Sequence, residues 1–84
     1  FTKIVTDGKI RYTVPQIITS DEDVKVYFRV SDVFRNVSIN VYDGDRGVFS
    51  KKRTRVAPGE MECITLNMSD IKKSAELEFR LEEI

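Results

Sequence analysis

A regular alternation of apolar and polar residues in the middle of the chain limits what this sequence can fold into. Between Asp23 and Gly44, apolar residues occupy every second position of two runs that are separated by Ser31–Asn36. These positions are Val24, Val26, Phe28 and Val30 in the first run, then Val37, Ile39 and Val41 in the second. Successive residues of a strand point to opposite faces, so each run predicts a β-strand with one buried face. We expect the two strands to be neighbours in a sheet that covers a core.

The first and last parts of the chain show the same pattern. Lys9–Val14 alternates and predicts a strand whose shared face carries Ile10, Tyr12 and Val14. Pro15 has no N–H for a ladder, so we expect an edge strand that breaks or switches sheets there and continues through Ile17–Ile18. Ala75–Glu83 alternates most cleanly, and its inward row is predicted to be Ala75, Leu77, Phe79 and Leu81.

Turn residues divide the rest of the chain. Asp43–Gly47 predicts a tight hairpin, and Pro58–Gly59 fits the central pair of a type II turn. The lysine-rich segment Val48–Ala57 between them is typical of an edge strand. Glu60–Asn67 predicts the next strand, with Ile64 and Leu66 in the core. We expect Met68–Ser74 to be a loop or one helical turn in which Ile71 fills the core.

These short segments recur about every 8–12 residues, which favours an all-β sandwich or barrel. We predict an immunoglobulin-like β-sandwich of six to seven antiparallel strands, with a small barrel as the alternative. The length of 84 residues suits one small domain. We assign residues 9–84 to this domain and residues 1–8 to a linker or a first strand.

Charge and cysteine content narrow the function classes. The 14 basic and 14 acidic residues cancel, which removes the global electrostatic case for binding nucleic acid or an anionic membrane. No apolar run approaches the ~20 residues of a membrane span. Cys63 is the only cysteine, so an intrachain disulfide is impossible, and we expect a reducing, cytoplasmic location.

The sequence predicts no catalytic, cofactor-binding or metal-binding residue. There is no histidine for a hydrolase triad, and no glycine-rich loop precedes a helix. The acidic runs Asp21–Asp23 and Asp43–Asp45 could suggest calcium, but neither has the EF-hand spacing, and acidic residues are common in β-turns.

Two surfaces are candidates for interaction with a partner. One is an exposed aromatic patch formed by Tyr12, Tyr27 and Tyr42. The other is the basic segment 51–55, in which alternation places Lys51, Arg53 and Arg55 on one face; its alternative role is a solvated edge opposite the acidic row Glu76, Glu78 and Glu82. Val33 and Phe34, in the link between the two central runs, either cap the core or face a neighbouring domain.

Three segments together resemble a known family. They are IRYTVPQ at Ile10–Gln16, EDVKVYFRVSDVFRNVSINV at Glu22–Val41 and VAPGEMECITL at Val56–Leu66. In this order they are similar to the C-terminal accessory domain of bacterial, clostridial-type FAD-dependent, NAD(P)-linked oxidoreductases, a group related to the pyridine nucleotide-disulfide oxidoreductases.

The resemblance implies a non-catalytic accessory domain that has a structural role or docks a subunit or partner. FAD and NAD(P) would bind in upstream domains of the parent protein, and this chain would hold no cofactor. The implied partners are the catalytic domains of the parent chain or its dimer mate. The alternative is an immunoglobulin-like adhesion or carbohydrate-binding module of a cell-surface protein.

Overall fold

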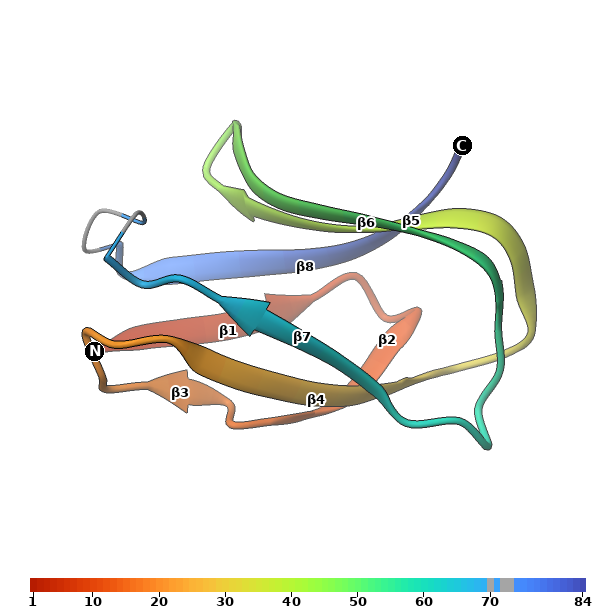
Figure 1. Ribbon diagram of the computed structural model, residues 1–84, viewed down its shortest axis with the longest axis horizontal. Helices are drawn as coiled ribbons and strands as arrows, with labels where there is room; N and C mark the ends of the chain where they lie inside the picture. Colours follow the sequence, from red (N-terminus) through yellow and green to blue (C-terminus); the bar gives the residue numbers. More distant parts are fainter. Residues whose placement is uncertain (70, 72–73) are drawn as a thin grey trace.

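The computed structural model describes residues 1–69, 71 and 74–84, which form two β-sheets and no helix (Figure 1). The strands follow one another along the chain and are bounded as follows: β1 Thr2–Thr6, β2 Ile10–Val14, β3 Ile17–Ile18, β4 Val24–Val30, β5 Phe34–Asp43, β6 Arg46–Val56, β7 Glu62–Leu66 and β8 Glu76–Glu83. The predicted all-β class with two layers is therefore confirmed.

The two sheets differ in size and in the direction of their strands. One sheet has the order β3-β1-β8-β5-β6, and the other has the order β2-β4-β7. β1 runs parallel to β8, whereas every other pair is antiparallel. The expectation of antiparallel strands throughout is thus wrong at this pair. The described residues also form eight strands rather than six or seven, because the chain around Pro15 contributes a strand to each sheet.

The central alternation is confirmed, but the pairing inferred from it is wrong. The inward rows of β4 and β5 are buried, apart from Val24, which packs against the core from its edge. β4 lies in the three-stranded sheet and β5 in the five-stranded sheet, so the link between them crosses from one layer to the other. Alternation shows which side of a strand is buried but does not show which strand lies beside it.

β2 departs from regular alternation at Tyr12. Tyr12 has a φ of 55°, in the left-handed region, and the pairing of β2 with β4 shifts register between Arg11 and Val14. Ile10 and Thr13 are buried as a result, while Tyr12 and Val14 are 73% and 63% exposed. The predicted common face of Ile10, Tyr12 and Val14 is therefore wrong. The predicted switch between sheets at Pro15 is confirmed, since β2 and β3 lie in different sheets.

The two turns occur where the sequence predicts them, but one of them is not of the predicted type. The predicted hairpin at Asp43–Gly47 joins β5 to β6, and Gly44 supplies a positive φ of 62°. At the Pro58–Gly59 turn, the Glu60 N–H donates to the Ala57 carbonyl at 3.0 Å. A type II turn needs a positive φ at its third residue, and Gly59 does not have one, so the predicted turn type is wrong.

The core fills the space between the sheets. At its centre, the rings of Phe28 on β4 and Phe79 on β8 meet edge to face, with centroids 6.2 Å apart. Ile71 is buried, as predicted, whereas Ala75 is exposed because β8 begins one residue later. The predicted 68–74 loop is described only in part, since residues 70, 72 and 73 lie outside the described residues.

The contact between the two rings predicts a measurable coupling. In a double-mutant cycle of Phe28→Leu and Phe79→Leu, we expect an interaction free energy of about 0.5–1.5 kcal/mol, the size typical of edge-to-face pairs. Urea unfolding of the four proteins measures it. Tyr27→Leu combined with Phe79→Leu is the control and should be additive, because Tyr27 points away from the core. Additivity in the first cycle would show that the rings contribute only their separate burial.

Candidate functional site

The three tyrosines predicted to form one patch do not share a single surface. Tyr27 is on the outer face of the three-stranded sheet, and Tyr42 is on β5 in the other sheet. Tyr12 lines a hollow of about 490 Å³ at the side of the domain, together with Phe1 and Ile17. The predicted patch does not exist as one surface, because β4 and β5 belong to opposite layers.

The outer face of the three-stranded sheet gathers an unusual set of side chains. Cross-strand pairing places Val14, Tyr27 and Cys63 in one row, with Arg11 opposite Arg29 and Lys25 opposite Thr65. We call these seven residues the basic face. It has an aromatic and apolar centre flanked by three cations, and none of its members is acidic.

The cations of the basic face lack carboxylate partners. Among the described residues, Arg11, Lys25 and Arg29 make no salt bridge, and Arg29 donates instead to the Pro58 carbonyl at 3.2 Å. Tyr27 at the centre is 40% exposed. The face therefore combines two arginines with an exposed tyrosine, which are residue types enriched at interface centres.

The strained backbone of β2 contributes to this face. A bulky residue at positive φ is uncommon, and such conformations cluster at functional positions. The irregularity at Tyr12 turns Val14 outward beside Tyr27, which is the effect a β-bulge has on the side chains that follow it. A regular strand would have directed Val14 to the same side as buried Ile10.

The basic segment of β6 is an edge of the five-stranded sheet, as predicted, but its acidic partners differ from those expected. Arg53 forms an ion pair with Glu62, and Arg55 bonds to Glu60 at 3.0 Å. β5 separates β6 from β8, so the row Glu76, Glu78 and Glu82 does not face this segment. Lys51 is exposed on the same strand. Two of the three cations predicted to contact a partner, Arg53 and Arg55, are thus already paired with carboxylates of this domain.

The Arg53–Glu62 pair joins the edges of the two sheets, and its loss should be costly. Glu62 is only 3% exposed, so Arg53→Met would leave a buried carboxylate without its cation. We expect a loss of about 3 kcal/mol in unfolding free energy by urea denaturation. The double variant with Glu62→Met should recover most of this loss, while Arg55→Met, which breaks an exposed pair, should cost under about 1 kcal/mol. Equal effects of the two single variants would contradict this.

A polar network covers the outer face of the five-stranded sheet at Tyr42. The Tyr42 hydroxyl donates to Glu82 Oε1 at 2.5 Å, and Asn40 Nδ2 donates to the same oxygen at 2.9 Å. The hydroxyls of Ser38 and Ser50 donate to Asn40 Oδ1 at 2.7 and 2.8 Å. Alternate residues of β5 thus bond both to one another and to the neighbouring strands.

These bonds shift two pKa values in opposite directions. The hydrogen bond from Tyr42, and then that from Asn40, lowers the pKa of Glu82 below its usual value. The bond to Glu82 raises the pKa of Tyr42. The Arg80 guanidinium lies 4.5 Å from the centre of the Tyr42 ring, so one face of this ring is already covered. We interpret the network as a structural lock on the sheet rather than a free surface.

The network predicts how Glu82 titrates. Tyr42→Phe removes the largest cause of the lowered pKa, so carboxyl NMR titration should show a higher Glu82 pKa. Glu82 contributes stability above its unfolded-state pKa and loses it as the pH falls through its lower folded-state pKa. The stability difference between wild type and Tyr42→Phe should therefore narrow over that acid range. Tyr27→Phe, on the other sheet, is the control. An unchanged Glu82 pKa in the Tyr42→Phe variant would contradict the assigned cause.

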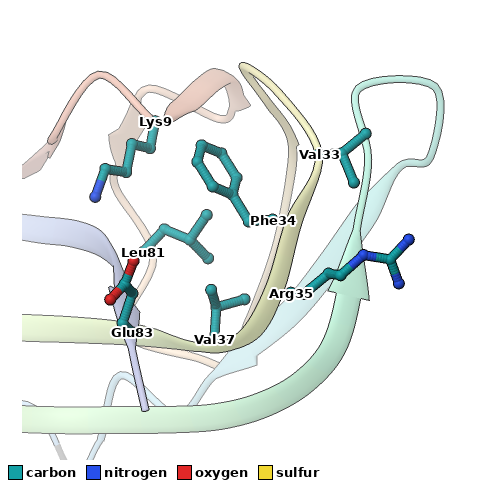
Figure 2. A pocket seen from close by; sticks show the side chains of 7 residues that line it. All are labelled: Lys9, Val33, Phe34, Arg35, Val37, Leu81 and Glu83. Atoms are coloured by element: carbon teal, nitrogen blue, oxygen red, sulfur yellow. The ribbon is translucent and has the colours of Figure 1, made fainter.

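A second hollow lies at the end of the domain where β8 finishes, and Figure 2 shows its lining. Its volume is about 330 Å³, near the lower limit for small-ligand sites. Lys9, Phe34, Leu81 and Glu83 gather on one side of it, while Val33 and Arg35 point away from them (Figure 2). The Lys9 ammonium lies 6.0 Å from the centre of the Phe34 ring. We call this hollow the end pocket.

The end pocket shows where the two apolar residues of the central link lie. Phe34 packs against the core, while Val33 is 44% exposed. Asn36 has a φ of 53°, and this interruption lets Phe34 reach the core although strict alternation from Val37 would turn it outward. Sequence reasoning noticed the pair but missed the pocket, because Lys9, just before β2, and Glu83, at the end of β8, are far apart in the sequence. The basic face was missed for the same reason.

The described residues contain no group of three or more histidine, cysteine, aspartate or glutamate side chains able to hold a metal ion. No helix that could cross a membrane occurs in this part of the chain.

Fold and surfaces together define a small all-β domain of two packed sheets. Comparison with protein-family models, curated proteins and solved structures finds no match for the chain.

Proposed function

We propose that this chain is a non-catalytic docking domain whose basic face binds an acidic protein surface. The observation that carries the proposal is the set of three cations without carboxylate partners around an exposed tyrosine. Elsewhere in the domain, Arg46, Arg53, Arg55 and Arg80 each lie against a carboxylate. Among the described residues, Lys3, Lys9, Arg35, Lys51 and Lys52 make no salt bridge either. The basic face differs from them in that its unpaired cations surround an exposed tyrosine, which suits a partner of opposite charge.

The size of the basic face favours a partner held on the same polypeptide. Three strands about 4.8 Å apart and up to seven residues long cover roughly 300–400 Å². A stable complex of separate proteins buries about 800 Å² on each side. A covalent tether raises the effective concentration and makes a small interface sufficient. The domain therefore suits docking onto another part of its own protein.

The proposal also includes the class of protein to which this domain belongs. The segments at Ile10–Gln16, Glu22–Val41 and Val56–Leu66 favour an FAD-dependent, NAD(P)-linked oxidoreductase as the parent. We also propose an immunoglobulin-like arrangement of the sheets. The β4–β5 and β6–β7 connections both cross between the layers, as they do in Greek-key sandwiches.

Charge reversal tests the docking face. The domain is added in trans to the remainder of its encoded polypeptide, and calorimetry measures the affinity. We expect Arg11→Glu with Arg29→Glu to weaken binding at least tenfold, and added salt to reduce the affinity of the wild type. Lys52→Glu, an exposed change on the other sheet, is the matched control. Equal affinities for all three proteins would refute docking through the basic face.

The parent is tested separately from the face. If it is an oxidoreductase of this kind, the coding sequence upstream of Phe1 encodes a strand followed by Gly-x-Gly-x-x-Gly at the start of a helix. Upstream β-modules or a secretion signal would instead support an adhesion or carbohydrate-binding protein. That result would leave the measured role of Arg11 and Arg29 unchanged.

A further inference from the structure

Of the four strands that lie at sheet edges, β6 is the longest and most regular. The other three are β3 in the same sheet, and β2 and β7 in the three-stranded sheet. β3 has two residues and β7 has five, while β2 is interrupted at Tyr12 and is followed by Pro15. β6 has 11 residues, and its register with β5 is regular from Phe49 to Val56. A long, regular edge can pair with another extended chain.

The alternation of the ladder identifies which main-chain groups of β6 are open. The Asn36 carbonyl, which follows the positive φ of that residue, accepts from the Ile84 N–H on the β8 side at 3.1 Å. From there to the end of the regular register, even-numbered residues of β5 bond toward β8 and odd-numbered residues bond toward β6. Odd-numbered residues of β5 lie opposite odd-numbered residues of β6, as Ile39 does opposite Lys51. The open edge therefore carries the main-chain groups of Ser50, Lys52 and Thr54.

Two lysines lie in the middle of this edge. Lys51 is on the inner side of the sheet, opposite buried Ile39, and Lys52 is on the outer side, opposite Ser38. Both are exposed, and neither makes a salt bridge among the described residues. Like charges opposite each other destabilise a strand pair, whereas opposite charges stabilise it. The lysines therefore disfavour pairing with a second copy of β6 and favour an acidic strand.

A hollow beside the edge offers a place for one apolar side chain. It has a volume of about 340 Å³ and lies between β6 and β7, with Phe49, Leu66 and Ile71 in its lining. Phe49 is on the inner side of β6, two residues before Lys51. If a strand runs antiparallel to β6 with an acidic residue opposite Lys51, its residue two positions later lies opposite Phe49. That residue reaches the hollow, where an apolar side chain is favoured.

We propose that the open edge of β6 binds an acidic, extended segment of a separate protein by β-strand addition. The segment runs antiparallel to β6, with acidic residues opposite Lys52 and Lys51 and an apolar residue opposite Phe49. Main-chain hydrogen bonds supply affinity, and the side chains on the two sides select the sequence. This mode holds separate peptides in other domains, so it needs no tether of the kind that the small basic face requires.

A short peptide tests the open edge. Acetylated, amidated Thr-Thr-Glu-Glu-Thr-Val is titrated into the chain and followed by amide chemical shifts and hydrogen exchange. In the proposed register, its first glutamate lies opposite Lys52 and its valine opposite Phe49. We expect saturable shifts along β6 and at least tenfold slower exchange of the Lys52 amide hydrogen at saturation. The peptide with lysine in place of both glutamates should not bind.

Two N-methylated peptides separate strand addition from attraction between charges. A methyl group on the main-chain nitrogen of the first glutamate, which faces β6, should weaken binding at least tenfold. The same group on the second glutamate, whose nitrogen faces away from β6, is the matched control and should be tolerated.

Two protein variants locate the bound peptide. Lys51→Gln with Lys52→Gln should weaken binding at least fivefold. Arg11→Gln with Arg29→Gln on the basic face changes the net charge equally, is the matched control and should leave the affinity unchanged.

Three results would overturn the proposal. The first is equal binding of the two N-methylated peptides, or shifts centred on Tyr27 instead of β6. The second is slower Lys52 exchange at higher concentration of the chain alone, which would assign the edge to a second copy. The third is slow Lys52 exchange in the longer encoded polypeptide without peptide, which would assign the edge to a strand of the same protein. Each would leave the docking test with Arg11 and Arg29 unaffected.

Discussion

The structure depends on the contact between two inner sheet faces across the Phe28–Phe79 pair. A chain of 84 residues buries only about 60–65% of its unfolded surface, so its core has little redundancy. Each sheet has one apolar face, and a second layer must cover that face to bury it. The packing of the inner rows thus positions every outer residue, including those that form the basic face.

Zero net charge hides an uneven distribution of charge. The outer face of the three-stranded sheet carries Arg11, Lys25 and Arg29 without carboxylates. The acidic residues of β8 lie on the other sheet, where Glu82 and Glu78 are held by Tyr42 and Arg80. Global composition argues against a uniformly basic protein. It does not reveal the charge of any single face, because positive and negative surfaces cancel in the net charge of the chain.

Local patterns predicted much of the fold. The inward rows of β4, β5 and β8, the hairpin at Asp43–Gly47 and the change of sheet at Pro15 follow from residue spacing and from the missing N–H of proline. The pattern failed at Tyr12 because a positive φ interrupts alternation there, and at Gly59 because a glycine permits a conformation without requiring it. Both predictions failed because the residue type at each position permits more than one backbone conformation.

The sequence by itself determined the all-β class and the buried rows of β4, β5 and β8. Only the tertiary structure decided which strands are neighbours. It separated Tyr27 from Tyr42, paired Arg53 with Glu62 and brought Lys9 and Glu83 to one pocket. The physical reason is that alternation is a local property of each strand. Layer assignment depends on how all the strands share one core, and a link such as Ser31–Asn36 can join neighbours or opposite sheets equally well.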